Sequence, residues 1–155
     1  MNHADPRRQR IGTVLVAFQF ALIGALGLYG APAFLRGNTP VGAWGLAAAG
    51  AILGGWALYC NRPGNFNIHP TPRPGGQLVR KGPYRLIRHP MYTAVLLCGL
   101  ALAWACGSVA AWSGWVVLLA VLAVKAAVEE RWMLSQHPDY IAYRVGTWRF
   151  VPGLY

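Results

Sequence analysis

Hydrophobic residues are concentrated in four segments of this chain, and polar or charged residues fill the stretches between them. The segments cover residues 11–29, 41–59, 91–106 and 109–128. A helix needs about 17 to 25 apolar residues to cross the hydrocarbon core of a bilayer, so the first two predict membrane-spanning helices directly. The apolar run from Met91 to Val124 is too long for one span and slightly short for two spans and a turn, so the break at Gly107 and Ser108 predicts a tight helical hairpin. The pattern predicts an all-α integral membrane protein with four transmembrane helices.

The composition supports this interpretation and excludes an ordinary soluble domain. Hydrophobic residues make up 55% of the 155 residues and charged residues 12%, whereas soluble domains have about 25% charged residues. The mean hydropathy is +0.36. We expect one membrane domain over residues 1–155, with a loop over 61–90 and a tail over 129–155.

Lysine and arginine are distributed unequally between the two ends of the predicted helices. They occur in the N-terminal arm, in the 61–90 loop and in the tail, whereas the opposite side carries only Arg36. The positive-inside bias therefore predicts that both termini and Gln77 are cytoplasmic, in what we expect to be a bacterial inner membrane. Membrane orientation explains the net charge of +10, so we expect no nucleic-acid partner. The first apolar segment is longer than the core of a signal peptide, which predicts a retained helix.

Small and polar residues inside the apolar segments predict how the helices pack. Gly50 and Gly54 form a small-residue pair that allows close helix approach, which we assign to packing within a monomer rather than to a dimer, although a dimer is compatible with it. Gln19 either lines a cavity or bonds to a neighbouring helix. Lys125 and Glu129 are expected to reach the membrane interface.

The loop and the tail are the two long polar segments. The 61–90 loop is rich in proline and glycine but also carries apolar residues, Phe66 and Ile68 among them, which predicts an ordered loop packed on the helices. The tail mixes aromatic and basic residues, which is typical of a helical segment lying at the membrane interface. We expect the loop and the tail to form one site on the cytoplasmic face.

The motif Arg88-His89-Pro90 begins the third apolar segment. Proline suits the first turn of a helix, and unpaired N–H groups at a helix start attract carboxylate or phosphate groups. Lipid headgroups could equally attract the two cations. The adjacent Glu129 and Glu130 favour a ligand site, because ionisable groups at the edge of a span often mark one. Adjacent helical residues point about 100° apart, so we expect only one of the two glutamates to contact the ligand. The other is expected to pair with a nearby arginine, Arg88 or Arg131.

A zwitterionic ligand with ribose hydroxyl groups, such as S-adenosylmethionine, would satisfy these cations and carboxylates together. The stretch "LVRKGPYRLIRHPMYTA", an apolar hairpin, "EE" and "YIAYRVGTWRFVP" also follow one another in this chain. This order resembles the superfamily of isoprenylcysteine carboxyl methyltransferases and phospholipid methyltransferases, in a small prokaryotic form. The family motif Arg-His-Pro-x-Tyr-x-Gly is matched at Arg88, His89, Pro90 and Tyr92, but Ala94 replaces the glycine.

The resemblance implies a membrane methyltransferase that uses S-adenosylmethionine, releases S-adenosylhomocysteine and is closed over by its tail. It places the cofactor against Lys81, Gly82, Pro83, Tyr84, His89, Pro90, Tyr92, Glu129 and Glu130. Of the two glutamates, the resemblance favours Glu129 for the direct contact. No catalytic group is identified, and the candidates for positioning the reactants are Arg88, Tyr92 and Arg144. Methyl displacement depends on alignment and on exclusion of water, so no metal is needed.

The acceptor and two rival functions stay open. A prenylcysteine carboxylate, a phospholipid amine and a small thiol all fit a lipid-like or small apolar acceptor reached from the membrane. An NADPH-dependent reductase related to sterol reductases is one rival, and a non-catalytic membrane subunit that retains the motif is the other. His69, His89, His137 and Cys60 lack the spacing of metal ligands on a helix, so we expect no metal site.

Overall fold

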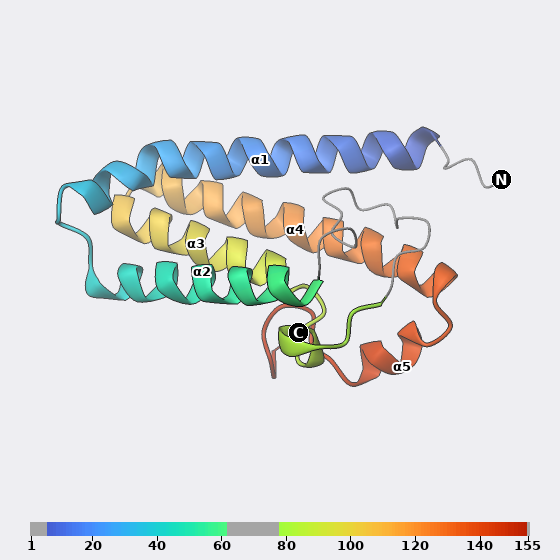
Figure 1. The fold of residues 1–155 in the computed structure, drawn as a ribbon. Coiled ribbons are helices and arrows are strands. Elements are labelled where there is room, and N and C mark those ends of the chain that lie inside the picture. The colour runs from blue at the N-terminus through green and yellow to red at the C-terminus, as the bar shows by residue number, and fades with distance from the viewer. Residues whose placement is uncertain (1–5, 62–77, 155) are drawn as a thin grey trace.

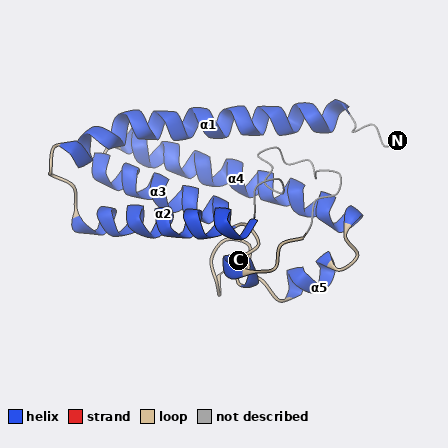
Figure 2. Ribbon diagram, viewed as in Figure 1, coloured by secondary structure: helices blue, strands red, loops and turns tan. Residues whose placement is uncertain are grey.

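A computed structural model describes residues 6–61 and 78–154, and the regular elements in these ranges are helices (Figures 1 and 2). In chain order they are α1 (Pro6–Leu35), α2 (Val41–Asn61), the 3₁₀ turn η1 (Gly82–Arg85), α3 (Pro90–Cys106), α4 (Val109–Gln136) and α5 (Tyr140–Val145). We predicted an ordered loop from Phe66 and Ile68 and a cytoplasmic position for Gln77. These three residues lie outside the described ranges.

Two helices extend beyond the apolar segments that predicted them. α1 extends past 11–29 at both ends, and α4 continues past residue 128 to Gln136. The added residues at the end of α4 include glutamate, arginine, methionine and leucine, which favour helix irrespective of their polarity. Glu129 and Glu130 therefore lie within a continuous helix rather than in a tail.

The chain reverses between α3 and α4 in a tight turn. Gly107 caps α3 with a φ of 66°, a left-handed conformation that favours glycine. Ser108 then caps α4 by accepting a hydrogen bond of 3.2 Å from the N–H of Ala111. Each helix end thus has its own local stop or start signal.

α3 lies at the centre of the helical bundle and packs against α1, α2 and α4 (Figure 1). The contact with α2 is close because the facing residues of α2 are small. A Cβ atom added at Gly50 would lie 2.9 Å from the carbonyl oxygen of Ala94 and 2.6 Å from Sγ of Cys98. Gly50 therefore serves packing within the chain.

Three of the helices are long and apolar enough to cross a membrane: Gln9–Leu35, Val41–Asn61 and Val109–Ser135. α3 is also apolar but has 17 residues. Large apolar side chains such as Leu28, Ile52 and Val116 point outward from the bundle, as expected for helices that contact lipid. The protein is a helical membrane protein.

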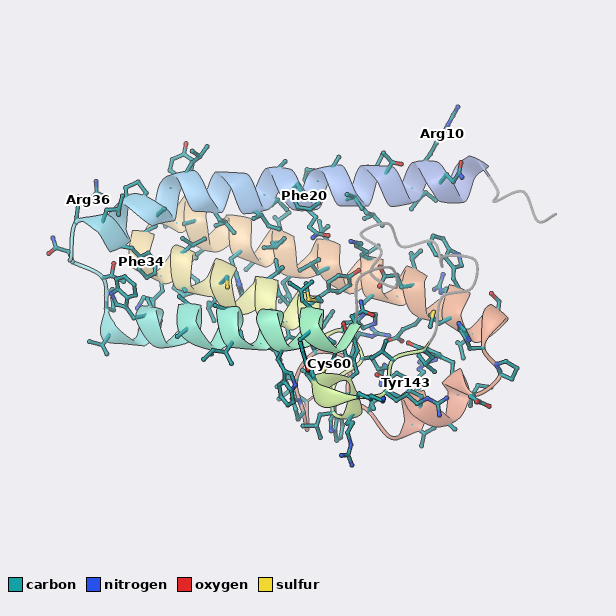
Figure 3. The ribbon with its side chains drawn as sticks, viewed as in Figure 1. Arg10, Phe20, Phe34, Arg36, Cys60 and Tyr143 are labelled. Carbon is teal, nitrogen blue, oxygen red and sulfur yellow. The ribbon has the colours of Figure 1, made fainter. Side chains whose placement is uncertain are left out.

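The bundle has two distinct ends. Arg36 lies at the end where α1 connects to α2, whereas Cys60 and Tyr143 lie toward the opposite end with η1 and α5 (Figure 3). The start of α3 is at this second end as well (Figure 1). We call it the site end, because the candidate residues gather there.

Candidate functional site

The C-terminal tail is joined to the segment that precedes α3. Ile87 and Trp148 form an isolated parallel bridge, in which the N–H of Arg88 donates to the carbonyl of Trp148 at 2.8 Å. The N–H of His89 donates to the carbonyl of Arg149 at 3.2 Å. The tail therefore lies against the Arg-His-Pro motif, although the two are about 60 residues apart in the sequence.

A buried carboxylate binds the side chains that this pairing brings together. Glu130 is 2% exposed, and its Oε1 accepts a hydrogen bond of 2.9 Å from Nε of Arg88. Its Oε2 accepts one of 2.9 Å from Nη2 of Arg149, and Nε2 of His89 lies 3.3 Å from Oε1. We call Glu130, Arg88, Arg149 and His89 the Glu130 cluster. Sequence reasoning named Arg88 as a possible partner for one glutamate, but it missed Arg149.

Arg88 also holds the end of α5. Its Nη1 donates to the carbonyl of Arg144 at 3.0 Å and to the carbonyl of Thr147. The side chain of Arg144 is 49% exposed, and its Nε lies 3.8 Å from Glu130. Of the candidates for positioning the reactants, Arg88 thus binds groups of the protein itself, whereas the side chain of Arg144 is exposed at the surface.

Glu129 occupies a different environment from Glu130. Its Oε1 accepts a hydrogen bond from the hydroxyl of Tyr92, and Nδ1 of His89 lies 3.5 Å from Oε2. Its side chain is 19% exposed. The rings of His89 and Tyr92 are stacked, with centroids 5.2 Å apart. Among the described residues, Glu129 therefore has no arginine partner, and its carboxylate is partly open to the outside.

His89 bridges the two glutamates. Burial alone would lower the pKa of His89, but its hydrogen bonds to Glu129 and Glu130 and the negative charges of these residues together raise the pKa above its ordinary value. In the imidazolium form both ring nitrogens are donors, so each can serve one carboxylate. His89 thereby fixes the position of Glu129 relative to the Glu130 cluster.

The turn η1 lies beside these residues. Gly82 has a φ of 57°, and a Cβ atom there would be 2.3 Å from Sγ of Cys60 at the end of α2. Pro83 is buried, while Lys81 is exposed. Only glycine can therefore bring this turn so close to α2.

Tyr84 connects η1 to α5 and to the carboxylates. Its carbonyl accepts a hydrogen bond of 2.7 Å from the hydroxyl of Tyr143. Burial raises the pKa of the Tyr84 hydroxyl, and Tyr143, Cys60 and Glu129 raise it further through their charges. The Tyr84 hydroxyl is therefore within electrostatic range of Glu129, so that η1, α3 and α4 contribute to one site.

The start of α3 differs from the sequence-based expectation. The N–H groups of Tyr92 and Thr93 donate to the carbonyl of His89 at 3.0 and 3.1 Å. The hydroxyl of Thr93 donates to the carbonyl of Phe150 at 2.9 Å. These two N–H groups are thus already paired, so the expectation of free N–H groups at the helix start is wrong for these two residues. Pro90 is buried beneath this turn.

Ala94, which replaces the glycine of the family motif, faces α2. Ala94 is 5% exposed. A Cβ atom added at Gly54 would lie 3.4 Å from the Cβ of Ala94. This is an ordinary contact distance. The methyl group of Ala94 is therefore accommodated by the glycine on the neighbouring helix.

Lys125 contradicts the expectation that it reaches the membrane interface. It is 1% exposed, and its Nζ donates a hydrogen bond of 2.9 Å to Oε1 of Gln19 on α1. Nζ also lies 5.0 Å from the centroid of the Tyr92 ring. A lysine at the centre of a span costs about 2.5 to 3.5 kcal/mol on insertion scales, so it is retained in the bundle only because partners compensate it. Of the two expectations for Gln19, a bond to a neighbouring helix is the one observed.

An apolar cavity of about 220 Å³ is lined by residues of α1, α2, α3 and α4. α1 and α2 both pack on α3 but make almost no contact with each other. The cavity lies between α1 and α2, beside α3. Its lining includes Ile23 and Leu26 of α1, Gly50 and Gly54 of α2, and Met91 and Val95 of α3. Met91 lies between His89 and Tyr92 in the sequence, so the cavity lining and the contacts of Glu129 both include residues at the start of α3.

In the described ranges, 6–61 and 78–154, no group of three or more His, Cys, Asp or Glu side chains is placed to hold a metal ion. Of the four residues considered as metal ligands, His69 lies outside these ranges.

Apolar helices, a buried charge cluster at one end and an adjoining apolar cavity define a membrane protein with a site at the edge of its bundle. The sequence model of the family "Phospholipid methyltransferase" matches residues 43–146. The chain belongs to this family of membrane methyltransferases, which is in the same superfamily as the isoprenylcysteine carboxyl methyltransferases. Comparisons with curated proteins and with solved structures gave no match.

Proposed function

We propose that this protein is an S-adenosylmethionine-dependent methyltransferase that acts on a lipid-like or small apolar acceptor at the cytoplasmic face of the membrane. The observation that carries this proposal is the position of Glu129. Its carboxylate is partly exposed and contacts Tyr92 and His89 at the start of α3, the same helix start whose Met91 lines an apolar cavity. We propose that a charged ligand held by Glu129 lies close to an apolar one in this cavity.

The residues at the site end fit the methyl donor chemically. Glu129 offers a carboxylate for its amine, and the exposed Lys81 offers an ammonium for its carboxylate. Tyr84 and Tyr92 offer aromatic rings and hydroxyl groups, and His89 orients Glu129. Glu130 is bound by Arg88 and Arg149, so we assign it to fixing the site rather than to direct contact with the donor.

The donor, when bound, supplies a methyl group on a positively charged sulfur. Displacement at this carbon needs the acceptor atom in line with it and water excluded. The protein provides alignment through the rigid Glu130 cluster, which ties α3, α4 and the tail together. The apolar walls around Met91 and Val95 exclude water on the acceptor side.

We propose that α3 also crosses the membrane, which gives four spans with both termini cytoplasmic. Its 17 residues are at the lower end of the range of about 17 to 25 for a spanning helix. The basic segments before α3 and after α4 are at the site end, whereas Arg36 is at the other end (Figure 3). The positive-inside rule then places the site end in the cytoplasm, in a bacterial inner membrane.

We further propose that the acceptor enters from the bilayer between α1 and α2. The cavity there is smaller than the roughly 300 to 1,000 Å³ typical of pockets for drug-sized ligands, so a long hydrocarbon chain would continue from it into the lipid. Gly50 and Gly54 face α3, so this glycine pair is not available to pack against a helix of a second copy. We therefore propose a monomer.

Filling the cavity should block the acceptor without affecting the donor. Gly54 lines the cavity, and the nearest atom to a Cβ there is 3.4 Å away, so Gly54→Leu should fold and project into the cavity. Overfilling an apolar site costs about 1 to 3 kcal/mol, so transfer of a radiolabelled methyl group to a membrane lipid extract should fall about tenfold or more. Binding of S-adenosylhomocysteine should not change.

Gly55→Leu is the matched control, since Gly55 is exposed and no atom lies within 4 Å of an added Cβ. It should leave transfer unchanged. Equal activity of the two variants would show that the acceptor does not use this cavity.

The proposed function is tested most directly by ligand binding to the detergent-purified protein. S-adenosylhomocysteine should bind with a saturable calorimetric signal, and excess NADPH should not displace it. Binding of NADPH instead would favour a reductase related to sterol reductases. Binding of neither ligand would contradict the enzyme and favour a subunit that retains the motif as scaffold.

A further inference from the structure

Two polar residues occupy positions where the bundle otherwise places apolar ones. On α4, Lys125 follows the buried Ala111 and Leu118 at seven-residue steps. On α1, Gln19 precedes the buried Leu26 by the same step. Such steps mark the inward face of a helix. Each helix thus has a polar residue on its inward face, and the two are hydrogen-bonded to each other.

Helix packing alone does not account for this pair. Buried polar partners can often be replaced by apolar residues of similar size with no loss of stability, or with a gain. Leucine or methionine at both positions would extend the apolar core formed by Leu26, Leu118 and Leu122. A charged residue in an apolar span therefore calls for a role besides holding α1 to α4.

The contacts of Lys125 lead to the candidate site. Its ammonium group, bonded to Gln19, faces the ring of Tyr92 at 5.0 Å from the centroid. The hydroxyl of the same ring donates to Glu129. Glu129 is also one helical turn after Lys125 on α4, a spacing that brings opposite charges close together. A continuous series of contacts thus runs from Gln19 through Lys125 and Tyr92 to Glu129.

We propose that Lys125 is a positioning residue for Glu129, and that it acts through Tyr92. A cation on the face of a phenol ring attracts its π electrons, which holds the ring in place and makes the hydroxyl a stronger donor. Tyr92 then fixes the carboxylate of Glu129 in the orientation that receives the methyl donor. This inference rests on the proposed function, and it adds a residue to which neither the sequence motif nor the family resemblance gives a role.

The same contacts connect the two halves of the site. Gln19 lies one helical turn before Ile23, which lines the apolar cavity. The helix that forms a wall of the acceptor cavity is therefore bonded to the residue that orients Glu129. The position of α1 and the orientation of Glu129 are set together.

The test separates this role from simple helix attachment. In the full-length protein carrying both Gln19→Leu and Lys125→Met, the polar pair becomes apolar, so the thermal unfolding temperature should be at or above that of the unaltered protein. Affinity for S-adenosylhomocysteine should nevertheless fall about tenfold. Leu122→Met, on the same face of α4, is the control and should bind normally. A stable double variant with full affinity would overturn the proposal.

A second comparison tests the route through Tyr92. In a Tyr92→Phe background the hydroxyl bond to Glu129 is absent, so adding the same two substitutions should weaken binding by less than about twofold. A full additional tenfold loss would show that Lys125 does not act through Tyr92 and would contradict the proposal. If the unaltered protein does not bind S-adenosylhomocysteine, the proposed function itself is wrong and the inference falls with it.

Discussion

Glu130→Gln should destabilise the protein by about 3 to 5 kcal/mol, the range measured when one partner of a buried ion pair is removed. Glu130 is 2% exposed and accepts from Arg88 and Arg149, whose side chains are 9% and 11% exposed. Glutamine would remove the carboxylate charge that both guanidinium groups bind. The loss is measurable as a reduced free energy of unfolding in chemical denaturation of the detergent-solubilised protein.

The neighbouring residue provides the matched control for stability. Glu129 has a tyrosine hydroxyl and a histidine as partners, and glutamine can still accept from the hydroxyl. Glu129→Gln should therefore cost only about 1 kcal/mol, the usual value of one hydrogen bond. Equal losses in the two variants would contradict the division between a structural and a ligand-binding glutamate.

For ligand affinity we expect the larger effect at Glu129, the residue whose substitution should cost less stability. Glu129→Gln should weaken binding of S-adenosylhomocysteine by about 1.5 to 3 kcal/mol, or about 10- to 150-fold, because a charged hydrogen-bonded contact is lost. Isothermal titration with detergent-purified protein measures this change. Arg131→Gln, an exposed substitution two residues along the same helix, should have no effect. Unchanged affinity in Glu129→Gln would remove Glu129 from the donor site.

Local patterns in the sequence predicted the helices and the stop at Gly107, because apolar length and capping residues act over a few neighbouring positions. The same holds for the separate environments of Glu129 and Glu130. Adjacent side chains on a helix point in different directions, so they had to meet different partners. These features follow from geometry within one helix.

The contacts between distant segments could not be obtained in this way. The pairing of Ile87 with Trp148, which brings Arg149 to Glu130, has no local signal in either segment. Lys125 was expected to extend to the interface, as lysines near helix ends commonly do. The seven-residue spacing from Leu118 places Lys125 on the inward face of α4, which the sequence could have indicated. This placement predicts a partner only when Gln19, at the same spacing from Leu26, is placed on the inward face of α1.

The parallel bridge between Ile87 and Trp148 also sets an order of events during synthesis. Ribosomes make Arg88 and Glu130 before Arg149, and the last partner of the buried carboxylate comes from the final residues of the described chain. Until those residues emerge, Glu130 lacks one of the two arginines that hydrogen-bond its carboxylate. The nascent protein can insert its helices first, but the buried carboxylate is held by both arginines only after the segment that follows α5 has been made.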